Sequence, residues 1–379
     1  DMKMLGIKSV TRYARASDFI PEIILQVERL IKQSFAYIVN NSVYFRINKF
    51  KDYGKLSGQK LTKLKIRAKK LADRDLLEAF GKEKEKESPL DFALWKASGP
   101  EEPGWKSPWG RGRPGWHIED TAISEKFFGP QYDIHGGGID LIFPHHECEI
   151  AQQESASGKK PFVRYWLHTG HLKVGGEKMS KSLGNFITIQ ELLKKSSPET
   201  FRLIVAQAHY RSPINYTEKL QKQAEASRQR LIEFVLKIKS KIGFTKAAAV
   251  KGDILGIKRT IYKARKDFYD ALRDDFNTPK AIAVVFSLVN KLNPKIDKGI
   301  EDLAKKEVEK FLKEVDGIFG IIGKLPKVKP SIQVVKLVVE REKLRKEKKW
   351  GEADKIRERV LKLGWQIEDT AFGPRLKKQ

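Results

Sequence analysis

Cysteine is almost absent from this sequence, since Cys148 is the only one among 379 residues. A single cysteine excludes an internal disulfide framework and is typical of a protein in a reducing compartment, so we expect a cytoplasmic protein. Long apolar segments are missing as well, because no run of 18 apolar residues occurs. That absence argues against a membrane-spanning helix and against a membrane as partner.

Negative charge is in short supply. The chain has 75 Lys and Arg against 48 Asp and Glu, which gives a formal net charge of +27. Such an excess favours a polyanionic partner, and nucleic acid is the commonest one. The alternative is a lysine-rich protein without such a partner, as some thermophiles have. The length predicts two to four domains.

The chemically richest segment is 115–149. Three glycines, Gly136–Gly138, follow a short β-type run at 132–135 and remove every side chain where that strand ends. A flat ligand can lie against such a backbone, and Asp140 just beyond can accept hydrogen bonds from its hydroxyls or amine. The segment also contains four of the seven histidines, namely His117, His135, His145 and His146. We therefore predict a ligand pocket here.

The same segment contains a candidate metal site. Pro144 favours the first turn of a helix, so we expect a helix to begin there. His145 and Glu149 are four residues apart and would share one face of it, with Asp120 upstream as a further acid. The alternative is an ordinary surface His-x-x-x-Glu pair. The concentration of histidines and acids within one short segment favours a ligand site.

A basic loop follows at 175–186, with the sequence G-G-E-K-M-S-K-S-L-G-N-F. Lys178 and Lys181 stand among serines and glycines, so a moving loop can place both ammonium groups on phosphates. The fragment K-x-S-K-S alone fits any solvated basic loop, whereas the full K-M-S-K-S-L-G-N is far more specific.

Hydrophobic periodicity and turn residues predict the secondary structure. An amphipathic helix is predicted at 18–34, a charged helical stretch at 60–87 and a single helix after the basic loop at 188–208. An all-helical region is predicted at 217–323 and a basic helix near the C-terminus at 339–360. A hairpin is predicted at 36–47, with Asn40 and Asn41 at its turn. The Pro- and Lys-rich segment 324–331 is predicted to be a linker.

Seven motifs occur in one order along the chain. They are Y-F-R-I-N-K-F-K-D-Y-G-K-L-S (44–57), P-L-D-F-A-L-W-K (89–96), S-P-W-G-R-G-R-P-G-W-H-I-E (107–119), D-I-H-G-G-G-I-D-L-I-F-P-H-H-E (133–147), K-M-S-K-S-L-G-N-F (178–186), H-Y-R-S-P-I-N-Y (209–216) and D-D-F-N-T-P-K-A (274–281). With these motifs the chain resembles cysteinyl-tRNA synthetase, a class I aminoacyl-tRNA synthetase. The resemblance covers nearly the whole chain.

The resemblance implies an α/β fold with a partial Rossmann-like catalytic domain that carries an insertion. An α-helical bundle of the anticodon-binding type and a small C-terminal domain would follow. The implied domains are the catalytic remnant (1–23 and 114–160), the insertion (24–113), a connector with the basic loop (161–216), the tRNA-binding bundle (217–323) and a small tRNA-binding domain (332–379).

The resemblance also implies a cysteine–tRNA ligase, which forms cysteinyl-adenylate from cysteine and ATP with Mg and transfers the cysteinyl group to tRNA(Cys). Lys178 and Lys181 would be catalytic. ATP would contact Gly136, Gly137, Gly138, Asp140, Met179, Ser180, Lys181 and Ser182. Trp116 and His135 would contact the amino acid. A zinc ion would bind Asp120, His145 and Glu149 and grip the substrate thiolate, which separates cysteine from serine.

The sequence departs from the family pattern in three places. Asp120 stands where the family has a zinc-binding cysteine, and Cys148 stands where it usually has Asn. Cys148 is therefore either a substitute thiolate ligand or, in the favoured interpretation, a neutral buried cysteine. The family's N-terminal part, with its H-x-G-H signature, is not in this sequence, so we expect a separate fragment to supply it or the chain to be incomplete.

Those departures leave two other functions open. One is a non-catalytic paralogue that only binds tRNA, and the other is an ATP-dependent ligase that joins cysteine to an amino-sugar.

Overall fold

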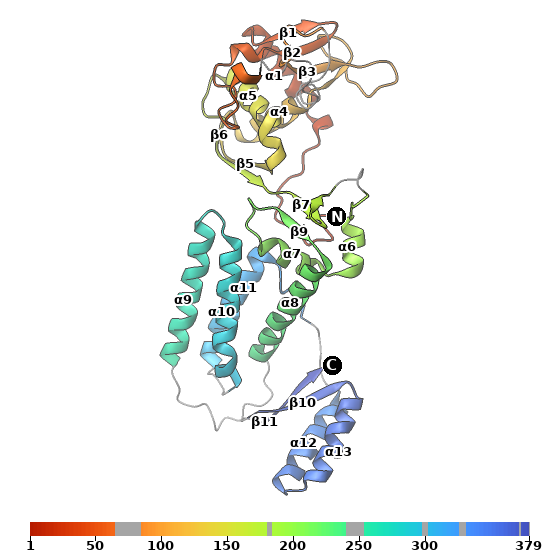
Figure 1. The fold of residues 1–379 in the computed structure, drawn as a ribbon, viewed down its shortest axis with the longest axis vertical. Coiled ribbons are helices and arrows are strands. Elements are labelled where there is room, and N and C mark those ends of the chain that lie inside the picture. The colour runs from red at the N-terminus through yellow and green to blue at the C-terminus, as the bar shows by residue number, and fades with distance from the viewer. Residues whose placement is uncertain are drawn as a thin grey trace. The chain divides into compact units, whose positions relative to one another are not determined.

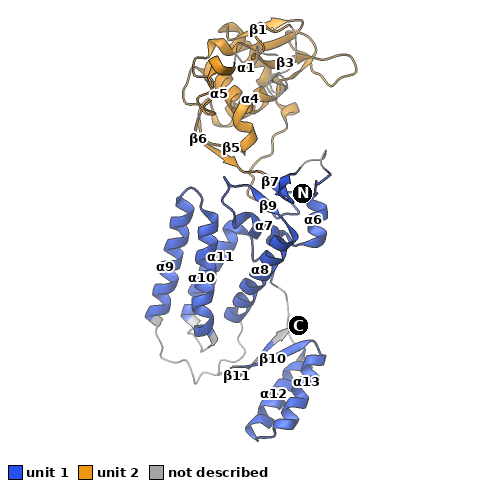
Figure 2. Ribbon diagram, viewed as in Figure 1, with its two compact units in different colours: residues 1–8, 172–379 blue, residues 9–171 orange. Residues whose placement is uncertain are grey.

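The computed structural model describes residues 1–64, 85–179, 184–239, 254–297, 302–325, 331–370 and 373–378. The chain forms two compact units, residues 9–171 and residues 1–8 with 172–379 (Figure 2). Most of the charged stretch predicted to be helical at 60–87 lies outside the described residues, as do Ser180, Lys181 and Ser182 of the basic loop.

A four-stranded antiparallel sheet forms one part of the unit 9–171. Its strands, in spatial order, are β1 (Ala36–Val39), β2 (Ser42–Phe45), β3 (Phe92–Ala97) and β4 (Gly112–Pro114). The predicted hairpin is confirmed, and its turn residues Asn40 and Asn41 have φ angles of 47° and 62°. A two-residue hairpin turn needs that left-handed conformation, and asparagine tolerates it better than most residues.

Three helices pack with this sheet around a shared core. They are α1 (Ile20–Lys32), α4 (Trp116–Phe128) and α5 (Glu147–Ser157), and they lie side by side in Figure 1. The predicted amphipathic helix is confirmed in α1, where the apolar side chains of Ile23, Val27 and Leu30 are fully buried. The helix continues through the predicted domain boundary at residues 23 and 24. Short 3-10 turns occur at Ala16–Asp18 and Ile47–Lys49.

A parallel pair of strands completes this unit, β5 (Tyr132–Gly138) with β6 (Val163–Thr169). The β-type run continues through all three glycines. After it come a 3-10 turn at Ile139–Leu141 and an irregular turn at Ile142–His146, in which Phe143 has an extended backbone. Phe143 is the only residue of this turn with non-helical angles, so helical backbone resumes at Pro144, as predicted, and continues into α5, which begins at Glu147.

The second unit begins with three short strands, β7 (Leu172–Val174), β8 (Glu177–Lys178) and β9 (Ile214–Tyr216), in the order β8-β7-β9. Two helices, α6 (Ile189–Lys195) and α7 (Pro198–Ala206), replace the single helix predicted at 188–208. Ser197 caps α7 by accepting a hydrogen bond from the backbone N–H of Thr200, and Pro198 occupies the first turn.

Four long helices make up the bundle of this unit. They are α8 (Glu218–Lys239), α9 (Ile254–Arg273), α10 (Thr278–Asp297) and α11 (Asp302–Phe319). The predicted all-helical region is thus confirmed for the described part of 217–323. The core between the helices includes Phe268, Phe311 and Val285, each nearly inaccessible to solvent.

The C-terminal part consists of two helices and a hairpin: α12 (Ile332–Lys346), α13 (Trp350–Lys362), and the antiparallel strands β10 (Trp365–Thr370) and β11 (Gly373–Lys378). The prediction of one basic helix through 339–360 is wrong, because the chain turns between α12 and α13 at Lys348, whose φ is 60°. The buried guanidinium of Arg341 donates two hydrogen bonds, 2.7 and 2.8 Å long, to Asp369 and ties α12 to β10. No helix in the described parts of the chain is long and apolar enough to cross a membrane.

Candidate functional site

The predicted metal ligands of the unit 9–171 lie together. The Nε2 atom of His145 is 2.9 Å from Oδ2 of Asp120 and 2.8 Å from Oε1 of Glu149. Helix α4 supplies Asp120, while the turn before α5 and the first turn of α5 supply the other two. The side chain of Glu149 is fully buried, whereas that of Asp120 is 46% exposed. The three donor atoms lie within 4.8 Å of one another, so the arrangement has the geometry of a cation site.

Glu149 provides a direct test of whether these residues fit a metal. Among the residues that the structure describes, neither of its buried carboxylate oxygens accepts a well-angled hydrogen bond. His145 is close to Oε1, but its hydrogen bond is directed to Asp120. Burying a carboxylate without hydrogen bonds is costly, and a divalent cation would remove that cost. The donor set of one imidazole and two carboxylates therefore fits a metal ion such as zinc.

Two further histidines form a second group of potential ligands with Glu149. The Nε2 atom of His135 on β5 is 3.5 Å from Oε2, and His146 belongs to the same group of potential ligands. The Nδ1 atom of His146 is hydrogen-bonded to Nε2 of His168 at 2.8 Å. The sequence did not single out His168. Its position follows from the parallel pairing of β5 and β6, which sets His168 opposite Gly137.

The surroundings set the protonation of these groups. Burial lowers the pKa of His117 and of His146 to about 3 and that of His135 to about 4. Burial acts in the same direction on His145, but the carboxylates of Asp120 and Glu149 outweigh it and raise its pKa. The two carboxylates thus favour the cationic form of His145, in which Nδ1 can donate to Nδ1 of His117, 2.7 Å away.

The three glycines are explained partly by packing. A Cβ atom at Gly137 would lie 2.8 Å from the His146 ring, and one at Gly138 would lie 2.5 Å from Oδ1 of Asp140. Gly137 therefore lets the imidazole of His146 approach the strand. The role of this strip in ATP binding remains a prediction.

The two residues predicted to contact the amino acid differ in exposure. Trp116 at the start of α4 is 61% exposed, and its ring centroid lies 4.3 Å from that of His145. His135 is partly buried, and its Nδ1 atom is 2.5 Å from the hydroxyl of Tyr132. An exposed indole thus lies directly beside the candidate metal site.

Cys148 points into the protein core. It is fully buried, its Sγ atom lies 3.3 Å from the hydroxyl of Tyr53, and burial raises its thiol pKa well above the usual value. It belongs to neither group of potential metal ligands in the described part of the chain. The structure therefore supports the neutral buried cysteine and not the substitute thiolate.

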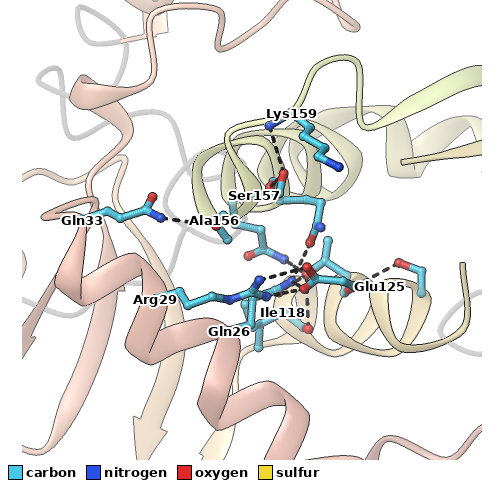
Figure 3. Close-up of polar contacts among 12 residues, drawn as sticks. Gln26, Arg29, Gln33, Ile118, Glu125, Ala156, Ser157 and Lys159 are labelled. Carbon is cyan, nitrogen blue, oxygen red and sulfur yellow. Dashed lines mark hydrogen bonds and ion pairs between the residues drawn. The ribbon is translucent and has the colours of Figure 1, made fainter. Parts of the chain in front are cut away.

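A buried polar network holds α4 against α1 and α5 (Figure 3). The hydroxyl of Thr121 donates to Oε1 of Gln26 at 2.7 Å and accepts from Nε2 of Gln152 at 2.6 Å. Gln152 also donates to the backbone carbonyl of His117. Nearby, Arg29 and Gln26 both donate to Glu125. Because Thr121 directly follows Asp120, this network anchors the turn of α4 that carries a candidate ligand.

We expect Thr121→Val to loosen helix α4. Valine has the same shape but no hydroxyl, so a buried oxygen of Gln26 and a buried N–H of Gln152 would lose their partner, at a cost of about 2–4 kcal/mol. Hydrogen exchange of the α4 amides should accelerate by roughly 30-fold or more. Ser124→Ala is the control, because it removes a hydroxyl of α4 that is bonded to the carbonyl of Thr121 and, among the described residues, forms no hydrogen bond with Gln26 or Gln152. Equal exchange in the two variants would contradict the role of the network.

Lys178 of the basic loop belongs to the other compact unit. Lys178 is exposed and ends β8, and the backbone N–H of Met179 donates to the carbonyl of Leu172. Lys181, with Ser180 and Ser182, lies outside the described residues. Their phosphate-binding roles remain predictions from the sequence.

Comparison with known families gives the class of protein. Residues 1–226 match the family described as "tRNA synthetases class I (C) catalytic domain", and residues 267–323 match the DALR domain. The methionyl-tRNA synthetase of Mycobacterium tuberculosis shares the fold, with a TM-score of 0.53 at 14% identity over 81% of this chain and 71% of that one. The α/β catalytic fold, its helical domain and its place among the class I aminoacyl-tRNA synthetases are thereby established.

The names of individual relatives indicate the amino acid after which the family is named. The chain is 46% identical to the cysteine–tRNA ligase of Thermococcus onnurineus over 98% of its own length and 78% of the relative's. It is 43% identical to the cysteine–tRNA ligase of Carboxydothermus hydrogenoformans over 100% and 79%. The chain belongs to the cysteine–tRNA ligase family. These relatives favour neither the non-catalytic paralogue nor the amino-sugar ligase.

Proposed function

We propose that the chain joins cysteine to tRNA(Cys) in two steps. The cysteine carboxylate attacks the α-phosphorus of ATP, which forms cysteinyl-adenylate and releases pyrophosphate. A hydroxyl of the terminal adenosine of the tRNA then attacks the carbonyl carbon and releases AMP. The observation that carries this proposal is the clustered donor set of Asp120, His145 and Glu149 in a chain of this family.

The chain's own residues would divide the work in the first step. Gly136–Gly138 and Asp140 would hold the adenosine, and Trp116 and His135 would surround the amino acid. Lys178 and Lys181 would stabilise the negative charge that builds on the phosphates, which Mg accompanies as part of the nucleotide substrate. Met179, Ser180 and Ser182 would line the same phosphate contact.

The candidate metal set would serve selectivity. Zinc bound by Asp120, His145 and Glu149 would act as a Lewis acid for the substrate thiolate and prefer it to the hydroxyl of serine. The chain orients this set through His117, which accepts a hydrogen bond from His145, and through the network behind α4. Asp120 is a harder ligand than the cysteine expected at this position, so zinc should bind there weakly.

The remaining parts of the chain would bind the tRNA. We assign this role to the bundle at 217–323 and to the small domain at 332–379. In the same proposal the catalytic domain comprises 1–23 and 114–160, with an insertion at 24–113, and 161–216 is the connector. The proposal implies a cytoplasmic protein.

Two assays test the proposal. Cysteine-dependent exchange between ATP and pyrophosphate measures the first step, and charging of a tRNA(Cys) transcript with labelled cysteine measures the second. Serine at the same concentration is the control substrate. The protein should exchange pyrophosphate with cysteine, and charging should require the transcript. Tight tRNA binding without exchange would instead support the non-catalytic alternative.

Asp120→Cys should strengthen zinc binding. A thiolate is a softer and stronger ligand for zinc than a carboxylate, so we expect the dissociation constant to fall by at least about tenfold. Competition with a chromophoric chelator measures the affinity, and Co²⁺ in place of zinc should show a new sulfur charge-transfer band. Asp120→Asn is the control, since it keeps the shape and removes the charge. An unchanged affinity with no sulfur band would show that position 120 does not contact the metal.

A further inference from the structure

We propose that a divalent transition-metal ion binds at His135, His146 and Glu149, a second position beside the one at Asp120, His145 and Glu149. The three donor atoms come from β5, from the turn before α5 and from α5 itself. They lie within 4.8 Å of one another, and both His146 and Glu149 are almost completely buried. This inference goes beyond the proposed function and does not depend on it.

Each imidazole of this second set is oriented by a partner on its other nitrogen. The Nδ1 atom of His135 contacts the hydroxyl of Tyr132, and the Nδ1 atom of His146 is hydrogen-bonded to His168. The Nε2 atom of His135 faces Glu149 and is 3.5 Å from Oε2. Metal-binding histidines in proteins characteristically have this arrangement, in which a second contact fixes the orientation of the ring.

Glu149 supplies one oxygen to each position. Oε1 lies 2.8 Å from His145, and Oε2 lies 3.5 Å from Nε2 of His135. Donor atoms about 2.0–2.1 Å from a tetrahedral zinc ion are about 3.4 Å apart. The spacing between Oε2 and His135 already has that value.

Packing holds the two rings of the second set in place. Each imidazole lies 4.8 Å, between ring centroids, from the indole of Trp166 on β6. On the strand side, the backbone of Gly137 approaches His146 so closely that a Cβ atom there would clash with the ring. The ligand position is thus built from side chains with little freedom to turn away.

The two sets differ in the types of ligand that they offer to zinc, and this difference predicts which one zinc prefers. The second set offers two imidazoles and one carboxylate, whereas the first offers one imidazole and two carboxylates. Imidazole suits zinc and cobalt, while carboxylate suits magnesium and manganese. The first set also includes the half-exposed Asp120. In the unmodified chain, zinc should therefore prefer the second position.

Metal titration of the full chain tests this inference without any activity assay. We expect His146→Gln to weaken Co²⁺ and Zn²⁺ binding by at least about 100-fold, since even the loss of a group that orients a ligand costs 10–100-fold. Asp120→Asn should change the affinity by less than about tenfold, because that residue belongs only to the first position. His171→Gln, a histidine outside both groups, is the matched control and should bind like the unmodified chain.

X-ray absorption of the unmodified chain with one equivalent of zinc gives a second readout, which does not require any variant to fold. Two imidazoles in the coordination shell would support the second position, whereas one imidazole would overturn it. A large loss of affinity in Asp120→Asn but not in His146→Gln would overturn it too. Because aminoacylation is measured separately, failure of the proposed function would leave this result intact, and the reverse also holds.

Discussion

Raising the salt concentration from 50 to 200 mM is expected to weaken tRNA binding by this protein by a factor of about 10³ to 10⁵. The basis is the net charge of +27, to which the bundle and the C-terminal helices both contribute lysines and arginines. Each lysine that neutralises a phosphate releases counterions, so the logarithm of the affinity falls linearly with the logarithm of the salt concentration. A factor of this size corresponds to about 6–10 phosphate contacts.

Fluorescence anisotropy with labelled tRNA(Cys) measures that dependence. Replacing the exposed residues Lys343, Lys346 and Lys348 by Gln should lower the slope by a little under one for each phosphate that is no longer neutralised. Lys51→Gln, an exposed change in the other compact unit, is the control. An affinity that stays constant between the two salt concentrations would contradict tRNA binding through the basic region from residue 217 onward.

Lys181→Ala should slow adenylate formation by about 10²- to 10³-fold and leave the affinity for cysteine nearly unchanged. The reason is that the lysine of the K-M-S-K-S sequence would meet the phosphates mainly when negative charge builds up during pyrophosphate release. An interaction made only in the transition state affects the rate and not ground-state binding of the other substrate. The maximal rate of ATP–pyrophosphate exchange measures the first effect, and calorimetric titration with cysteine measures the second.

Lys194→Ala is a suitable control for that experiment, because Lys194 is exposed on α6 and lies outside the K-M-S-K-S sequence. It should exchange pyrophosphate at the normal rate. A Lys181→Ala variant that keeps the normal maximal rate would reject the catalytic role. A variant that loses cysteine affinity and rate together would place the lysine in substrate binding instead.

Local signals predicted those elements that local interactions determine. The periodicity of Ile23, Val27 and Leu30 was sufficient for α1, and Asn40 and Asn41 were sufficient for the hairpin turn. Helix ends were less predictable. The break before Pro198 depends on one side-chain cap at Ser197, and a helix-favouring lysine, Lys348, adopts the left-handed conformation between α12 and α13.

The candidate site was predictable only in part, for the same reason. The spacing of His145 and Glu149 follows from one helical turn, and their contact was expected. The contribution of His168 depends on the pairing of β6 with β5, which no spacing along the chain reveals. Cys148 illustrates the converse, since its nearness to His145 in sequence suggested a ligand while the helix turns it toward Tyr53.

Glu149 belongs to both groups of potential ligands, and this affects how the site responds to a substitution. A substitution at position 120 changes only one of the two groups of potential ligands that share Glu149. The other group, with His135 and His146, is unaffected. Replacement of a thiolate by Asp120 would then move the bound ion by a few ångströms instead of expelling it. In the proposed second position, a substitution at residue 120 therefore leaves all three ligands of the ion unchanged.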